Sequence, residues 1–160
     1  MSNIVEIWTD GACSKNPGPG GWAAVSNFNN GPMYILTGTE KNSTNQRMEI
    51  SAVFNGLKKS YAHFKEKGID SINVYSDSAY VCNCMNDKWY NNWRKNGWKN
   101  SKKQPVINQE LWEALLENKE YIESNDIKIN FIKVKGHTDD EMNNLCDRLA
   151  VYARENIAND

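Results

Sequence analysis

The stretch IVEIWTDGAC, residues 4–13, decides how the rest of the chain is interpreted. As a β-strand, this run would place Ile4, Glu6 and Trp8 on one side and Val5, Ile7 and Thr9 on the other, and Asp10 followed by Gly11 ends the strand. Asp-Gly is a common turn dipeptide, so a plain turn explains the ending. A carboxylate at the end of a buried strand also suits a ligand site at the rim of a sheet. The stretch alone leaves both interpretations open.

Length and composition predict an ordinary globular protein. The chain has 160 residues, of which 39% are hydrophobic and 24% are charged, and its net charge is −1. This length suits one domain, expected over residues 1–160. No run approaches the ~20 apolar residues of a membrane span, and the N-terminus has no basic segment followed by an apolar one. We therefore expect a monomeric protein in the cytoplasm without membrane contact.

The four cysteines do not form a recognisable pattern. No C-x₂-C pair combines with histidines, as a zinc site requires, and Cys82 and Cys84 are only two positions apart. We expect free thiols and no zinc.

Hydrophobic periodicity and turn signals predict a mixed α/β fold. The succession β-β-β-α-β-α-α-α-β-α indicates an antiparallel opening followed by parallel strands joined through helices. Asn30-Gly31 is the expected first hairpin turn, and the last helix should present Leu145, Leu149 and Tyr152 to the core. The expected strands cover residues 4–10, 22–28, 33–40, 69–76 and 127–134, and the expected helices cover about 18 residues from 43–46 onward, 78–86, a short one within 88–103, 106–122 and 144–157, with a polar loop at 135–143.

Four carboxylates are candidates for one site. Asp10 and Asp77 each follow an apolar strand, Glu49 lies early in the first helix, and Asp147 is expected in the first turn of the last helix. Solvated acids near helix N-termini are the plain alternative for Glu49 and Asp147. Gathered in one cleft, four carboxylates would need cations. Oxygen ligands without thiolate or imidazole select Mg²⁺ or Mn²⁺, and two such ions can promote phosphodiester hydrolysis.

The Trp/Lys segment, residues 88–103, carries six basic residues and no acidic one, together with half of the six tryptophans. Cations beside aromatic rings suit a surface that binds a nucleic-acid backbone and stacks on bases. A solvated helix face with tryptophans in the core is the alternative interpretation.

Six motifs give the chain a specific resemblance to type 1 ribonuclease H. They are TDGACSKNPGPGGW (9–22), TNQRMEI (44–50), YSDSAYV (75–81), NNWRKNGWK (91–99), VKGH (134–137) and CDRLA (146–150), in the order found in that family. The resemblance implies an α/β, ribonuclease H-like fold, a five-stranded mixed sheet with helices on both faces. It also implies an endonuclease that hydrolyses the RNA strand of RNA–DNA hybrids by two-metal-ion catalysis, leaving 5′-phosphate and 3′-hydroxyl ends. Mg²⁺ is the implied cofactor, with two ions per site and Mn²⁺ as a substitute.

The resemblance also assigns roles to particular residues. The metal-binding catalytic carboxylates are Asp10, Glu49, Asp77 and Asp147, and the catalytic loop histidine is His137. The RNA-strand contacts are Cys13, Asn16, Asn45 and Gln46, and the DNA-strand contacts are Thr44, Tyr80, Trp89, Trp93, Lys99, Ser101 and Asn108. One departure is Asn42, where the family often has an arginine in the pocket for a DNA phosphate. No separate hybrid-binding domain is expected.

Other functions remain open at this stage. A nucleic-acid-binding domain without catalysis would have no use for four mutually repelling carboxylates. A transposase or integrase core is disfavoured by the TNQRME motif. A cysteine hydrolase would need Cys13 and His137 to pair, which their spacing cannot show. The loop NPGPGG lacks the arrangement of a phosphate-binding P-loop.

Overall fold

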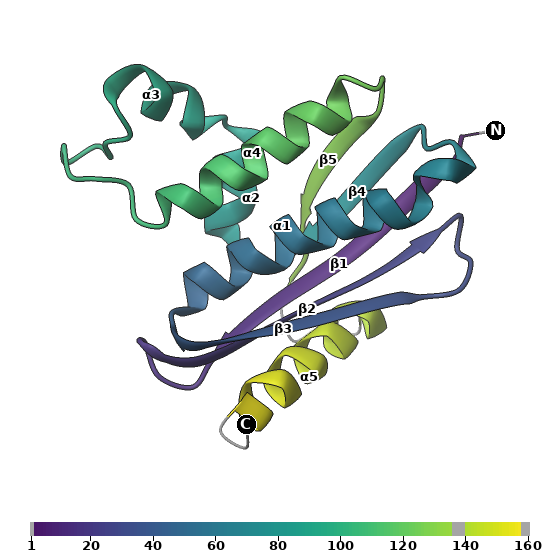
Figure 1. Ribbon diagram of the computed structural model, residues 1–160, viewed down its shortest axis with the longest axis horizontal. Coiled ribbons are helices and arrows are strands. Elements are labelled where there is room, and N and C mark those ends of the chain that lie inside the picture. Colours follow the sequence, from purple (N-terminus) through teal and green to yellow (C-terminus); the bar gives the residue numbers. More distant parts are fainter. Residues whose placement is uncertain (1, 136–139, 158–160) are drawn as a thin grey trace.

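The computed structural model describes residues 2–135 and 140–157 of the chain. Five strands form one mixed sheet in the order β3-β2-β1-β4-β5 (Figure 1). Their bounds are β1 Ile4–Cys13, β2 Gly18–Phe28, β3 Tyr34–Ser43, β4 Ser71–Ser76 and β5 Lys128–Lys133. Strands β1, β2 and β3 pair antiparallel, whereas β1, β4 and β5 run parallel. The mixed sheet expected from the sequence is confirmed.

Helices cover both faces of this sheet. They are α1 Asn45–Phe64, continued by the short 3₁₀ helix η1 Lys65–Lys67, then α2 Ala79–Asn86, α3 Trp89–Asn96, α4 Gln109–Glu123 and α5 Glu141–Asn156. Within β2, Ala24 belongs to the main core with α1, whereas Ala23 clusters with Ala150 of α5. Because neighbouring strand residues point to opposite faces, α1 and α5 lie on opposite sides. Helix α4 packs beside α1, and α3 projects from the rest of the molecule (Figure 1).

Strand β1 does not end at Asp10, so the expected turn there is wrong. The strand continues to Cys13, and Asp10 and Gly11 pair with Ala23 and Trp22 of β2. A side chain at Gly11 would place its Cβ 2.6 Å from the backbone nitrogen of Glu49. The glycine is therefore required by the close approach of α1.

The first hairpin turn lies one residue earlier than expected. Asn29 and Asn30, with φ of 51° and 60°, occupy its centre, and the Gly31 N–H donates to the Phe28 carbonyl at 2.9 Å. Two consecutive left-handed residues are the signature of the turn that matches the twist of a hairpin. Asparagine tolerates that conformation, so the glycine is not needed at the centre.

Helix α5 begins at Glu141, three residues before the expected start. Asp140 is the N-cap, and its Oδ1 accepts from the backbone nitrogens of Met142 and Asn143 at 3.0 and 3.1 Å. Asp147 therefore lies in the second turn of the helix and not in the first.

The predicted apolar face of α5 is only partly correct, because Leu149 packs against the cluster of Ala12, Ala23 and Ala150 whereas Tyr152 does not face the core. Tyr152 is 67% exposed, and the buried positions are Asn143, Cys146 and Ala150. A Cβ at Gly21 would lie 2.4 Å from the Ala150 carbonyl oxygen. Small residues face β2 because the two backbones nearly touch at this point of α5.

Helix α4 begins at Gln109, later than the expected residue 106. Val106 is buried, and its N–H donates to the Trp98 carbonyl at 2.9 Å, which ties the end of the loop back to the Trp/Lys segment.

The four cysteines are free, as expected. Within residues 2–135 and 140–157, no helix combines the length and apolar character needed to span a bilayer.

Candidate active site

Two carboxylates lie where the parallel strands of the sheet end. The β1–β4 ladder closes with the pair Trp8 and Tyr75. Asp10 follows two residues later on β1, and Asp77 comes directly after the last residue of β4. Ligand sites in sheets of this kind form beyond the carboxyl ends of the parallel strands.

Helix α1 adds Glu49 to the same rim. The absence of a side chain at Gly11 lets the second turn of α1 rest against β1. Ligand oxygens of Asp10, Glu49 and Asp77 lie within 4.8 Å of one another. The structure thus brings together three of the four carboxylates that the sequence singled out.

Asp147 lies at the edge of this carboxylate cluster. It lines a small cavity of about 170 Å³ together with the three clustered carboxylates and with Asn143 and Asn144. Its carboxylate does not belong to the group within 4.8 Å. Asn143 is 3% exposed, so a buried carboxamide is part of the wall.

Burial and mutual repulsion favour protonated carboxyl groups in the cluster. Burial, followed by the charge of Asp77, raises the pKa of Asp10 to about 7. Burial, followed by the charges of Asp10 and Asp77, raises the pKa of Glu49 well above its ordinary value. The Gly11 N–H, which donates to Asp10 Oδ1 at 2.9 Å, acts in the opposite direction on Asp10. A bound cation would relieve this repulsion by replacing the protons.

The cluster fits a hard divalent cation. Glu49 Oε2 is buried and has no hydrogen-bond partner within the described parts of the chain. Burying a carboxylate oxygen without a partner costs folding free energy. Because the neighbouring carboxylates are also negative, a metal ion is the partner that suits this oxygen. All three donors are carboxylates, which is the chemistry that Mg²⁺ and Mn²⁺ prefer.

Three of the four predicted RNA-strand residues form one hydrogen-bonded group near the start of α1. The backbone N–H of Cys13 donates to Asn45 Oδ1 at 3.0 Å, and the backbone N–H of Asn45 donates to Asn16 Oδ1 at 3.0 Å. These bonds join the end of β1, the following loop and the start of α1. Gln46 is exposed in the first turn of α1. The Cys13 Sγ lies within hydrogen-bond reach of three carbonyl oxygens, that of Lys15 being nearest at 2.6 Å.

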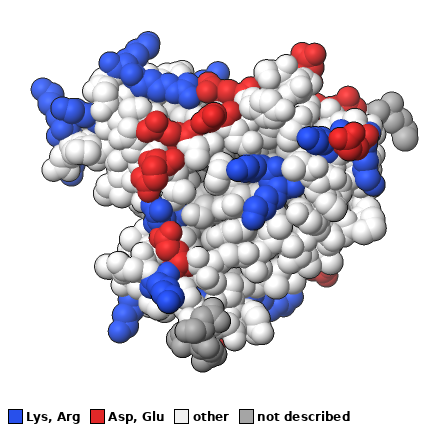
Figure 2. Space-filling view, viewed as in Figure 1, with Lys and Arg blue, Asp and Glu red and all other residues white. Residues whose placement is uncertain are grey.

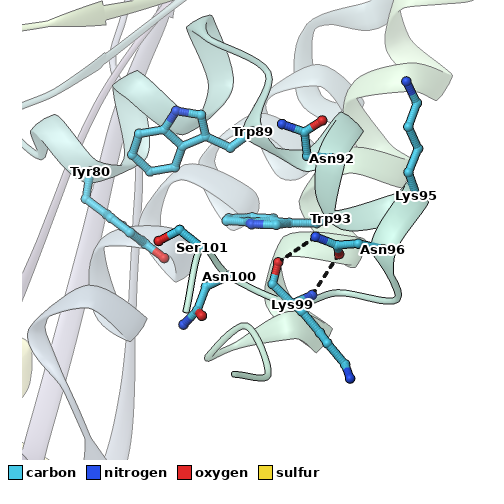
Figure 3. A pocket seen from close by; sticks show the side chains of 9 residues that line it. All are labelled: Tyr80, Trp89, Asn92, Trp93, Lys95, Asn96, Lys99, Asn100 and Ser101. Carbon is cyan, nitrogen blue, oxygen red and sulfur yellow. Dashed lines mark hydrogen bonds between the residues drawn. The ribbon is translucent and has the colours of Figure 1, made fainter. Parts of the chain in front are cut away.

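Most of the predicted DNA-strand residues line a second, larger cavity of about 690 Å³. It is formed by Tyr80, Trp89, Asn92, Trp93, Lys95, Asn96, Lys99, Asn100 and Ser101 (Figure 3). Trp93 is 8% exposed, so it serves both the core and the cavity. Asn96 holds the loop through two bonds with the backbone of Lys99, at 2.9 and 3.0 Å. The burial of Trp93 agrees with the interpretation that places tryptophans in the core, and the nucleic-acid-binding interpretation stays a prediction.

Charge is segregated around this cavity. Lys and Arg side chains gather over α3 and the loop that follows it, whereas Asp and Glu side chains gather over α4 (Figure 2). Arg94 belongs to the boundary, because its guanidinium binds both carboxylate oxygens of Glu120 at 2.8 and 3.0 Å. The other five basic residues of the segment form no ion pair within residues 2–135 and 140–157.

The remaining two predicted DNA-strand residues meet at Arg47. Thr44 is the N-cap of α1, and its Oγ1 accepts from the Arg47 backbone nitrogen at 3.1 Å. Asn108 precedes α4, and its Oδ1 accepts from Arg47 Nη1 at 3.2 Å. Neither residue lines the larger cavity.

Some candidate site residues were not identified from the sequence, and one predicted residue is not described by the structure. His137 lies outside the described residues. Asn143 was missed because residues 135–143 were expected to be a loop, and the acidic cap at Asp140 followed by Glu141 is a helix-start signal that would have placed it on α5. Asn144 was placed on the expected helix 144–157 but was not singled out as a site residue. Arg47 was quoted within a motif, but its partners are distant in sequence.

The sheet order and the rim carboxylates define an α/β protein with a ribonuclease H-like fold. The RNase H family model matches residues 2–155. Ribonuclease H of Thermoanaerobacter sp. (strain X514) is 52% identical over 153 residues, covering 94% of this chain and 91% of its own. Ribonuclease H of Syntrophomonas wolfei subsp. wolfei is 49% identical over 157 residues, covering 98% and 99%. The chain belongs to the RNase H family.

A solved structure shares the fold at lower identity. The structure of LC11-RNase H1 in complex with RNA/DNA hybrid superposes with a TM-score of 0.73 at 20% identity, covering 96% of this chain and 99% of that one.

Proposed function

We propose that this protein is an endonuclease that hydrolyses the RNA strand of RNA–DNA hybrids with two divalent metal ions, Mg²⁺ or Mn²⁺. The products would carry 5′-phosphate and 3′-hydroxyl ends. The observation that carries the proposal is the cluster of Asp10, Glu49 and Asp77 at the rim of the sheet. Family membership and the hybrid named with LC11-RNase H1 support the choice of substrate.

The carboxylates have distinct tasks in this proposal. Asp10, Glu49 and Asp77 would hold the ions, and Asp147 at the cavity edge would complete the site. Such ions activate a water molecule and stabilise charge on the leaving oxygen. Because the pKa values of Asp10 and Glu49 are raised, these groups release protons when a cation binds. His137 is proposed to help protons move or the product leave, since an imidazole titrates near neutral pH.

Discrimination of RNA is assigned to the group around Asn45. RNA differs from DNA by a 2′-hydroxyl in a wide, shallow minor groove. The Oδ1 atoms of Asn16 and Asn45 already accept backbone N–H groups. Their NH₂ groups make no hydrogen bond within the described parts of the chain and stay available for a 2′-hydroxyl. Cys13 and Gln46 complete the proposed contact.

The DNA strand is assigned to the larger cavity and to the Arg47 group. Tyr80, Trp89 and Trp93 offer aromatic surface, and Lys99 and Ser101 offer donors (Figure 3). Thr44 and Asn108 are the proposed contacts to a DNA phosphate. Cations beside aromatic rings bind nucleic-acid backbones without reading the sequence.

We further propose that the enzyme is a monomer located in the cytoplasm. Product analysis tests the chemistry. A hybrid is labelled first on the RNA and then on the DNA, and is incubated with protein in Mg²⁺, in Mn²⁺ and in chelator. RNA fragments that polynucleotide kinase can label only after phosphatase treatment would support the proposal. Cut DNA, or cleavage that persists in chelator, would refute it.

A further inference from the structure

We propose that Arg47 is a positioning residue that makes Thr44 and Asn108 a donor-only contact for one phosphate of the DNA strand. The inference rests on the proposed function, which assigns Thr44 and Asn108 to that strand. The inference adds Arg47, whose guanidinium would not touch the phosphate. Arg47 would instead orient the side chains of Thr44 and Asn108, which make the contact.

Three segments meet at the guanidinium of Arg47. Its Nε donates to Glu40 Oε1 of β3 at 2.6 Å, and its Nη1 donates to Glu110 Oε1 of α4 at 2.5 Å and to Asn108 Oδ1 at 3.2 Å. The Arg47 side chain is 26% exposed. Two carboxylates compensate its single charge, so the guanidinium orients its neighbours more than it attracts an anion.

The bond to Arg47 decides which way the Asn108 carboxamide points. A guanidinium has donors and no acceptor. The carboxamide oxygen of Asn108 must therefore face Arg47, and its NH₂ group must face away. Asn108 is partly exposed and is held in the left-handed region at φ 66°. Its NH₂ group has no acceptor within residues 2–135 and 140–157.

The backbone of Arg47 does the same for Thr44. The Arg47 N–H donates to Thr44 Oγ1 at 3.1 Å, so the hydroxyl oxygen acts as the acceptor that caps the helix. The hydroxyl hydrogen stays available for a ligand, because no described residue accepts it. The side-chain oxygens of Thr44 and Asn108 thus both accept hydrogen bonds from Arg47, and their hydrogens stay available as donors. Two donors fixed to the same residue suit the oxygens of a phosphate.

This arrangement explains how a phosphate could be held where position 42 is asparagine. Neutral donors release few counterions, so losing them should weaken binding with little change in its salt dependence. A direct arginine contact would instead change the slope of log K against log salt by about 0.9. The salt slope therefore separates a positioning role from a charge contact.

A phosphate scan tests the proposal. In hybrids of one sequence, each DNA phosphate in turn is replaced by an uncharged methylphosphonate, and Kd is measured with protein carrying Asp10→Asn to prevent cleavage. Without further change, one position should weaken binding about 10- to 100-fold, the range for a hydrogen bond to a charged group. With Arg47→Lys added, Kd for the unmodified hybrid should rise by a similar factor, and that position should lose its effect.

Matched variants separate positioning from a structural clamp. Glu110→Gln removes a carboxylate but leaves Arg47 facing Asn108, so the melting temperature should fall while the phosphate scan stays unchanged. Asn108→Asp removes the NH₂ donors without touching Arg47 and should abolish the position-specific effect, which keeps the proposal testable even if Arg47→Lys unfolds. A position-specific loss that persists in Arg47→Lys, or a flat scan with Arg47 intact, would overturn the inference. Cleavage of the unmodified hybrid by the unaltered enzyme reports on the proposed function separately.

Discussion

The backbone of Glu49 lies so close to Gly11 that a Cβ at position 11 would be 2.6 Å from its nitrogen. Helix α1 can reach strand β1 only because residue 11 has no side chain. The same contact sets Glu49 beside Asp10, so packing and the proposed chemistry depend on one glycine.

Gly11→Ala should therefore damage catalysis more than folding. The added methyl group pushes the second turn of α1 away from β1, and a displacement of ~1 Å at a reacting centre can cost about 100-fold in rate. We expect kcat on a hybrid to fall at least about tenfold, with a far-ultraviolet circular dichroism spectrum like that of the unaltered protein. Gly31→Ala, in the distant hairpin, is the matched control. An unchanged kcat in Gly11→Ala would contradict the packing argument.

Asp10→Asn should stabilise the metal-free protein in a pH-dependent way. Folding raises the pKa of Asp10 from 3.8 to about 7, so folding disfavours the ionised form. This penalty is absent below about pH 4, grows between pH 4 and 7, and is complete above pH 7. Asparagine avoids it at every pH. The gain in melting temperature should thus be small at pH 4 and largest at pH 8, measured in chelator.

The exposed Asp87→Asn serves as the control and should show no such pH-dependent gain. Added Mg²⁺ should reduce the advantage of Asp10→Asn, because the cation stabilises only the protein that keeps its ligand. An advantage of Asp10→Asn that shrinks from pH 4 to pH 8 would contradict the sign derived from the raised pKa.

Sequence patterns predicted more of the fold than of the details of the site. Alternation and helical spacing were enough for the order of elements, since each pattern is local. The role of Gly11 was not accessible, because Asp-Gly reads as a turn until the position of α1 is known. The buried face of α5 was missed for a similar reason: Ala150 faces the sheet because Gly21 lies opposite. Arg47 contacts Asn108 across 61 positions, which no local pattern reveals.

Neutralising the loop lysines should reduce the salt dependence of hybrid binding. Lys99, Lys102 and Lys103 lie in the basic loop after α3 and are exposed. Each phosphate contact contributes about 0.9 to the slope of log K against log salt. The triple change to glutamine should lower that slope by about one to three. Arg94→Gln, which loses an ion pair with Glu120, should lower the melting temperature and leave the slope unchanged. Equal effects on the slope would contradict the segregation of charge.

His137→Ala should slow turnover without abolishing it. A residue that assists proton movement or product release contributes about 10²- to 10⁴-fold at most, whereas Asp10→Asn removes a proposed metal ligand and should leave no measurable cleavage. Steady-state rates on the same hybrid, with Mg²⁺ in excess, compare the two. Equal losses in both variants would show that the roles are wrongly divided.

Substrate selection tests the central claim most directly. One sequence is prepared as RNA–DNA hybrid, RNA duplex and DNA duplex, and each is incubated with the protein with and without Mg²⁺. The account predicts that only the RNA strand of the hybrid is cut and that the reaction stops when Mg²⁺ is withdrawn. Tight binding of the hybrid without cleavage in Mg²⁺, or equal cleavage of all three duplexes, would contradict it.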